Sequence, residues 1–272
     1  MRILFLCHAF NSLSQRLYSE LGARGHLLSI EFDIADAVSE EAVALFRPEL
    51  IIAPYLRRAI PATIWQQHTC LIVHPGIVGD RGPSALDWAI QEGVPIWGVT
   101  VLQATGEMDA GPIWASETFT MRLAKKSSLY RHEVSEAATR AVLKAVDRFA
   151  ASGFVPMPLA AGDSSLCGRR RPLLKQADRA IDWRRDDTAH VLARINAADG
   201  FPGVADALFG QPCHLFDAHP GQRPAGREEA APGTLLARRD GALLRATADG
   251  AVWIGHVRRA DSPHPFKLPA TL

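Results

Sequence analysis

The chain has 272 residues, enough for one large or two modest domains with separate hydrophobic cores, and its 47% hydrophobic and 7% aromatic content is that of an ordinary α/β protein. Its formal net charge of +1 gives no excess of basic charge, so nucleic acid is not an expected partner. Four widely spaced cysteines indicate neither a metal site nor a disulfide framework, and the absence of a long apolar run indicates no membrane segment, so a cytoplasmic protein is expected.

The first half of the chain alternates apolar runs with helical segments. Strands are predicted at 2–8, 27–32, 50–55, 70–73, 96–103 and, as a sheet edge, 114–121. Helices are predicted at 12–21, from Ser39 onward, around 64–67, at 84–92 and from Ser127 or Ser128 to Phe149. This order favours a doubly wound, mostly parallel sheet with right-handed crossovers.

The second half differs in composition. Proline, glycine and the run Arg169-Arg170-Arg171 predict a linker over 153–176, which separates a domain over 1–152 from a smaller one over 177–272. After a helix from Asp186 or Thr188 to Asn196, short alternating runs predict strands at 204–209, 214–217, 233–237, 242–246 and 252–257. The smaller domain is therefore expected to be mostly β and barrel-like.

The stretch from His74 to Ile90 carries most of the functional information. His74 ends a predicted strand, and in open α/β sheets ligands bind beyond the carboxyl ends of the strands. The strand at 96–103 leads through a glycine-containing loop to Asp109, so an imidazole and a carboxylate are expected to meet at one rim. Taken alone, His74 is better explained as a residue that caps a strand, and Asp109 as a residue of a turn.

The wider pattern resembles the 10-formyltetrahydrofolate-dependent formyltransferases. Their signature is Asn-x-His, a Gly/Pro loop with Arg-Gly, then Trp-Ala-Ile and Asp-x-Gly-x-Ile. The matching segments here are His74, Arg81-Gly82, Trp88-Ala89-Ile90 and Asp109-Ala110-Gly111-Pro112-Ile113. The smaller domain is similar to the carboxy-terminal domain of the methionyl-tRNA enzymes through Ala180-Ile181-Asp182-Trp183 and Phe201-Pro202-Gly203.

The resemblance implies roles for individual residues. His74 would donate to the formyl oxyanion, and Asp109 would orient His74 and accept a proton. The position of the family's Asn holds Ile72, which cannot donate a hydrogen bond. The family loops that hold the pterin imply folate contacts from Leu56, Arg57, Arg58, Ile60, Arg81, Ala104, Thr105, Gly106 and Glu107.

Several of these positions also have simpler explanations. Arg57 and Arg58 also fit an exposed, solvated pair, and Arg81 is expected to hold its own loop, with Asp80 as a candidate partner. The run Arg169-Arg170-Arg171 is expected to be a solvated linker, with binding of coenzyme A phosphates as the alternative. Cys7 lies at the end of the first strand and is expected to line the pocket rather than act as a nucleophile.

One segment resembles most the amino-terminal part of the HoxX-like hydrogenase maturation proteins. It has the sequence His-Pro-Gly-Ile-x-Gly-Asp-Arg-Gly-Pro-Ser and follows Ile72. That resemblance implies formyl transfer from 10-formyltetrahydrofolate to coenzyme A and release of carbon monoxide as a hydrogenase ligand. Such proteins add a crotonase-like half, which we expect to be absent here, in a fragment or in an enzyme that stops at the first step. A crotonase-like domain and hydrogenase maturation proteins are the expected protein partners.

Loss of one oxyanion donor costs roughly 3 kcal/mol of transition-state stabilisation, so Ile72 requires an explanation. A backbone or substrate group can replace the donor, a thiol acceptor can need it less, or the site can bind folate and catalyse little. The alternatives are therefore formylation of methionyl-tRNA or an amino sugar, hydrolysis to formate, and a non-catalytic folate-binding assembly module.

Overall fold

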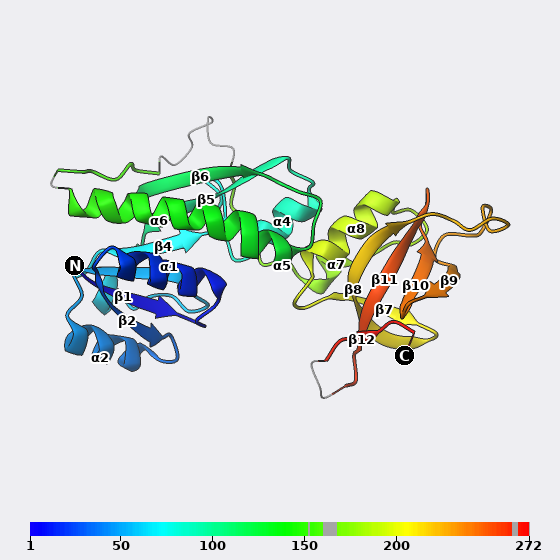
Figure 1. Cartoon of the computed structure of the whole chain (residues 1–272), viewed down its shortest axis with the longest axis horizontal. Helices are drawn as coiled ribbons and strands as arrows, with labels where there is room; N and C mark the ends of the chain where they lie inside the picture. Colours follow the sequence, from blue (N-terminus) through cyan, green and yellow to red (C-terminus); the bar gives the residue numbers. More distant parts are fainter. Residues whose placement is uncertain (152, 160–167, 263–265, 272) are drawn as a thin grey trace. The chain divides into compact units, whose positions relative to one another are not determined.

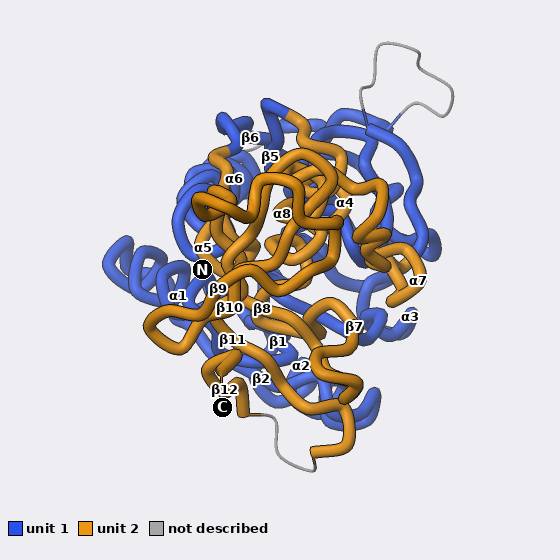
Figure 2. Tube along the Cα trace, turned by 90° about the vertical axis from the view of Figure 1, so that its right-hand side faces the viewer, with its two compact units in different colours: residues 1–85, 95–121, 130–172 blue, residues 86–94, 122–129, 173–272 orange. Residues whose placement is uncertain are grey.

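The computed structural model describes residues 1–151, 153–159, 168–262 and 266–271, and it divides the chain into two compact units (Figure 2). Unit 1 consists of residues 1–85, 95–121 and 130–172, and unit 2 consists of residues 86–94, 122–129 and 173–272. None of the helices in these described ranges is long and apolar enough to cross a membrane.

Unit 1 is built on a six-stranded sheet (Figure 1). Its strands are β1 (Arg2–Cys7), β2 (Leu27–Phe32), β3 (Leu50–Tyr55), β4 (Cys70–His74), β5 (Ile96–Gln103) and β6 (Ile113–Thr120). The spatial order is β2-β1-β3-β4-β5-β6, with the first four strands parallel and β5 and β6 antiparallel to their neighbours. The predicted mostly parallel α/β sheet is confirmed, and β6 is an edge strand as expected.

Helices cover both faces of this sheet. The side chains of β1 show this, because they point alternately to one face and to the other and contact different helices on each. Phe5 contacts Tyr18 of α1 (Ser12–Ala23), whereas Leu4 and Leu6 belong to a core cluster with α2 (Asp36–Phe46) and α3 (Ala62–Trp65). On α6 (Ser135–Ala150) the buried side chains are mostly alanine and valine, so the helix packs closely along β5 and β6 (Figure 1). Parallel strands with apolar residues on both faces require this double cover.

Two predicted helices have different bounds. The helix expected from Ser39 begins at Asp36, so Ser39 is a buried residue within α2 rather than its start. The helix expected from Ser127 or Ser128 to Phe149 is divided into α5 (Lys126–Leu129), a π-helical turn (Tyr130–Val134) and α6. The hydroxyl of Ser135 donates to the carbonyl of Tyr130 at this change of winding, which local side-chain bonding of this kind can stabilise.

Unit 2 combines four short helices with an antiparallel sheet. Its helices are α4 (Ala85–Gln91), whose first residue belongs to unit 1, α5, α7 (Gln176–Arg179) and α8 (Thr188–Ala197). Its strands are β7 (Val204–Leu208), β8 (Gln211–Gly221), β9 (Leu235–Arg239), β10 (Ala242–Ala246), β11 (Ala251–Arg259) and β12 (Leu268–Pro269). The order is β7-β8-β11-β10-β9, and α8 packs on β8 and β11, which confirms the predicted mostly β second domain.

Asp87 explains why two segments from the first half of the chain belong to unit 2. Its Oδ1 atom accepts bonds from Arg179 Nη2 at 2.9 Å and from Lys126 Nζ at 3.1 Å. Arg179 is buried, so its charge requires this carboxylate. These contacts hold α4, α5 and α7 together. The predicted domain limits at residues 152 and 177 stay a prediction.

Asp217 is the centre of a second polar cluster in unit 2. It occupies the left-handed region within β8 with a φ of 60°, opposite Gly255, where a Cβ atom would lie 2.2 Å from Asp217 Oδ2. The carboxylate accepts bonds from Lys125, from His219 Nε2 at 3.0 Å and from His256 Nδ1 at 2.8 Å. Burial opposes ionisation of this carboxyl, but the three bonds outweigh it and lower its pKa from 3.8 to about 2.

Asp217→Asn is therefore expected to destabilise unit 2 in a pH-dependent manner. A carboxyl whose folded pKa is depressed contributes stability above its unfolded pKa of 3.8 and loses it as the pH falls through about 2. The free energy of unfolding, measured by urea denaturation, should differ most between wild type and variant above pH 3.8, and the difference should shrink toward pH 2. Asp147→Asn, at an exposed pair with Arg24 in unit 1, is the control. A difference that persists unchanged at pH 2 would contradict this assignment.

Candidate functional site

The predicted catalytic pair meets in unit 1, although by a different route from the one expected. Because β5 runs antiparallel to β4, its last residue pairs with Leu71 and not with His74. The loop 104–112 folds back instead, and Asp109 adopts a left-handed conformation with a φ of 53°. Its Oδ2 atom lies 3.4 Å from His74 Nδ1 and accepts the backbone N–H of Gly82 at 3.0 Å. Both side chains are buried.

His74 lies between two carboxylates, of which the sequence predicted only one. Its Nε2 atom is 3.0 Å from Asp80 Oδ2, and Asp80 is 2% exposed. Asp80 was a candidate partner of Arg81, but the structure pairs it with His74 and Arg171 instead. Arg81 Nη1 instead binds Glu107 Oε1 at 2.7 Å, because the Arg81 side chain is directed to the partly exposed side of the loop.

The partner of Asp80 is Arg171, whose Nη1 atom lies 2.6 Å from Asp80 Oδ1. Arg171 is buried, and its guanidinium lies 5.4 Å from the centroid of the Trp97 ring. The expected solvated linker is therefore wrong for this arginine, although Arg169 and Arg170 are exposed. Arg171, Asp80, His74 and Asp109 therefore form a row in which basic and acidic side chains alternate.

Ile72 lies two residues before His74 on β4, so both side chains face the same side of the sheet. It is partly buried and packs against the core cluster that also contains Ile60 and Ala104, with Leu56 packed against the same cluster. Three predicted folate contacts and Ile72 thus belong to, or pack against, the same apolar cluster. We call these four residues, Leu56, Ile60, Ile72 and Ala104, the apolar floor.

The remaining predicted folate contacts lie in two exposed loops. Arg57 and Arg58 donate their backbone N–H groups to Asp33 Oδ2, each at 3.3 Å, and the Arg58 side chain binds Asp36 at 2.5 Å. Thr105, Gly106 and Glu107 are exposed in the loop that leads to Asp109. Thr105 Oγ1 donates to the carbonyl of Glu107 at 3.2 Å, which shapes that loop.

Sequence analysis missed Asp33 and Asp80, the buried carboxylates that hold the predicted residues. Asp33 follows directly after β2, which placed it at the carboxyl ends of the parallel strands, and Asp80 is part of the motif itself. Asp33 Oδ1 also binds His8 Nδ1 at 3.1 Å at the end of β1. Position at a strand end was thus the available signal for Asp33.

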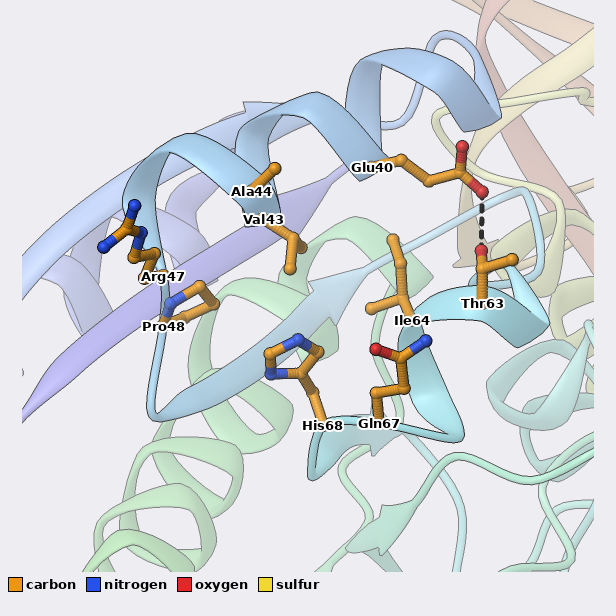
Figure 3. Close-up of a pocket in the computed structure, with 9 residues that line it drawn as sticks. All are labelled: Glu40, Val43, Ala44, Arg47, Pro48, Thr63, Ile64, Gln67 and His68. Carbon is orange, nitrogen blue, oxygen red and sulfur yellow. Dashed lines mark hydrogen bonds between the residues drawn. The ribbon is translucent and has the colours of Figure 1, made fainter.

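The other reactive groups do not add to this site. In the described part of the chain, no group of three or more His, Cys, Asp or Glu side chains has the arrangement of a metal site. Cys167 lies outside the described residues. A pocket of about 540 Å³ lies on α2 and α3, where Glu40 bonds Thr63 (Figure 3), but none of the predicted site residues lines it.

Family models and curated relatives match both the first and the second part of the chain. Residues 33–146 match the family model described as formyl transferase, and residues 173–264 match the model described as formyl transferase, C-terminal domain. The hydrogenase maturation factor HoxX of Bradyrhizobium diazoefficiens is 56% identical over 270 residues, which cover 99% of this chain and 46% of that protein. A methionyl-tRNA formyltransferase of Variovorax paradoxus is 26% identical over 226 residues, 82% of this chain and 68% of that protein.

Solved structures of the same two kinds of protein are also similar to this chain. HypX from Aquifex aeolicus in complex with tetrahydrofolic acid has a TM-score of 0.91 and 46% identity, covering 99% of this chain and 46% of that one. The methionyl-tRNA formyltransferase from Clostridium thermocellum, with a TM-score of 0.64 and 18% identity, covers 80% of this chain and 93% of that one and shares the fold. The chain therefore spans about half the length of its HoxX and HypX relatives.

Cys7 is expected to be chemically inert despite its position at the end of β1. Burial raises the pKa of its thiol to about 11, partly offset by a bond to Ser14 and reinforced by Asp33. At pH 8 roughly 0.1% of such a thiol is ionised. Cys7→Ser should leave the number of thiols that react rapidly with dithionitrobenzoate in the native protein unchanged, and should lower the count by one after unfolding. Loss of one rapidly reacting native thiol would contradict the assignment.

Proposed function

Because the chain belongs to the formyl transferase family, we propose that it removes the formyl group of 10-formyltetrahydrofolate and transfers it to the thiol of coenzyme A. The formyl-CoA produced would supply carbon monoxide as a ligand during maturation of a nickel-iron hydrogenase. The pairing of His74 with Asp109 supports this proposal more than any other observation. Similarity to HoxX and to the tetrahydrofolic acid complex of HypX supports the folate and the biological role.

The reaction needs a donor for developing negative charge and a group that moves one proton. The sulfur of the acceptor attacks the formyl carbon and forms a tetrahedral centre, whose oxygen becomes an oxyanion. The proton of the acceptor thiol passes to the buried pair of His74 and Asp109 during the attack. It is then delivered to N10 of the folate as the bond from the formyl carbon to N10 breaks and tetrahydrofolate leaves. His74 and Asp109 are both buried, so their electrostatic interactions are stronger than they would be in water. We assign the proton transfer to this pair.

The apolar floor favours a thiol as the acceptor. An amine must lose a proton during attack, and an Asn donor would help to stabilise the resulting oxyanion. Ile72 provides no such donor, and its neighbours Leu56, Ile60 and Ala104 provide no polar side chain either. An oxyanion forms with either acceptor, but a thiolate is a stronger nucleophile than an amine, so its attack tolerates the loss of one oxyanion donor better.

Two exposed loops supply contacts for the folate in this proposal. Arg57 and Arg58 present cationic side chains from a loop whose backbone Asp33 fixes, which suits the carboxylates of a folate glutamate tail. Leu56, Ile60 and Ala104 supply apolar surface for the pterin. Thr105, Gly106, Glu107 and Arg81 line the loop region beside Asp109.

We expect tetrahydrofolate to be released from 10-formyltetrahydrofolate only when coenzyme A is present, with formyl-CoA detected by mass spectrometry. His74→Ala should lower kcat by at least about 100-fold, because general acid-base catalysis contributes on that order, while folate binding measured by calorimetry is retained. Arg24→Gln, which removes an exposed ion pair in unit 1, is the matched control.

The other outcomes identify the alternatives. Release of formate without coenzyme A would indicate a hydrolase, and formylation of methionyl-tRNA or an amino sugar would indicate an amine acceptor. Folate binding with no turnover under any condition would indicate a non-catalytic assembly module. Each of these three results would overturn the proposed transfer to coenzyme A.

A further inference from the structure

Asp80 is among the most deeply buried charged residues of unit 1, although the signature of the family does not include a carboxylate at its position. It is 2% exposed and makes two direct contacts with charged or ionisable groups: Oδ2 with His74 Nε2 at 3.0 Å and Oδ1 with Arg171 Nη1 at 2.6 Å. An ion of this kind costs several kcal/mol to bury unless partners compensate for lost hydration. Burial of the Asp80 charge therefore depends on both of its partners.

The contact fixes which nitrogen of His74 carries a proton. A carboxylate accepts hydrogen bonds, and the contact with Asp80 is the shorter of the two that His74 makes, so we assign the proton of the imidazole to Nε2, as a donor to Asp80 Oδ2. The other nitrogen, Nδ1, is directed to Asp109 Oδ2 at 3.4 Å, a longer contact that leaves room for adjustment. The imidazole thus has one firmly held side and one side at which a proton can move.

The loop that carries Asp80 is fixed from three directions. Trp97 Nε1 donates to the carbonyl of Pro75 at 2.9 Å, and Thr100 Oγ1 donates to the carbonyl of Gly76 at 2.8 Å. A Cβ atom on Gly76 would lie 2.4 Å from His74 Nε2 and 2.6 Å from Asp80 Oδ2, so only glycine allows this hydrogen bond. The geometry between Asp80 and His74 is therefore set by the backbone and not only by the two side chains.

Arg171 is held equally closely. Its backbone N–H donates to the carbonyl of Arg81 at 2.8 Å, and a Cβ atom on Gly82 would lie 2.1 Å from its carbonyl oxygen. A Cβ atom on Gly168 would lie 2.0 Å from the backbone nitrogen of Asp80. The segment 168–171 thus lies directly on the loop 79–82, which brings a guanidinium to the far side of Asp80.

We propose that Asp80, clamped by Arg171, is the positioning residue for His74 in the proposed formyl transfer, on which this inference rests. The orienting role that the family resemblance gives to Asp109 belongs to Asp80. Asp109 instead shares the reacting side of the imidazole and exchanges a proton with His74 Nδ1. Arg171 supplies the cation that faces Asp80 Oδ1, while Asp80 Oδ2 accepts the proton of His74 Nε2.

Nuclear magnetic resonance of the full chain labelled with ¹⁵N-histidine tests the positioning without any turnover. The His74 signal is identified as the one missing from His74→Gln. In the wild type, Nε2 should carry the proton, with a coupling pattern typical of that tautomer. In Asp80→Ala, the bond to Nε2 is lost, and the proton should shift toward Nδ1 and Asp109. An unchanged His74 signal in Asp80→Ala would overturn the proposal, even if the enzyme has no coenzyme A activity.

Kinetics test the consequence of positioning. Asp80→Asn is expected to lower kcat on the order of 100-fold while the KM for 10-formyltetrahydrofolate stays within about twofold, because Asp80 acts through His74 and not on the substrate. The control is Asp147→Asn, which alters an exposed Asp–Arg pair in the same unit. A kcat for Asp80→Asn within twofold of that control would overturn the positioning role.

The clamp provides a second variant if Asp80 substitutions fail to fold. Arg171→Gln leaves Asp80 in place but removes its cation, and should lower kcat by roughly tenfold, with partial rescue in Arg171→Lys. Because Asp80 and Arg171 act as one unit, the double variant Asp80→Asn/Arg171→Gln should be no slower than Asp80→Asn. Additive losses would contradict the clamp. Absence of turnover in the wild type would refute the proposed function alone, because the resonance experiment does not depend on it.

Discussion

The need to neutralise buried charge is the constraint on which the site of unit 1 depends. His74, Asp80 and Asp109 are all buried, and Arg171 completes an alternating row in which each group faces one of opposite or compensating character. The row cannot form unless two backbone segments far apart in sequence lie against each other. Charge compensation therefore determines the path of residues 168–171 as strongly as apolar packing does elsewhere.

The site has a polar side and an apolar side with different tasks. The polar side contains the carboxylates around His74, and it controls where protons lie. The apolar floor, made of Leu56, Ile60, Ile72 and Ala104, contains no side-chain hydrogen-bond donor or acceptor.

The sequence predicted the elements well and the connections between them less well. The strands 27–32, 50–55, 96–103 and 242–246 match residue for residue, because each is a mainly apolar run that begins directly after a polar, glycine or proline residue. His74 and Asp109 were found from position and motif. The role of Asp80 was missed because a carboxylate beside an arginine in sequence suggests a local pair, whereas its actual partner is 91 residues away. Composition alone could not separate Arg171 from its two exposed neighbours.

Each of the two units is built from segments that are separated in the sequence, which limits where the chain can be cut or recombined. Unit 2 takes residues 86–94 and 122–129 from within the first half of the sequence, and these bring Asp87, Lys125 and Lys126 to it. A recombination breakpoint or truncation near residue 173 would leave Arg179 and Asp217 without these partners. The carboxy-terminal part is thus not a cassette that can be exchanged by one cut, and its sequence must change in step with two loops encoded much earlier in the gene.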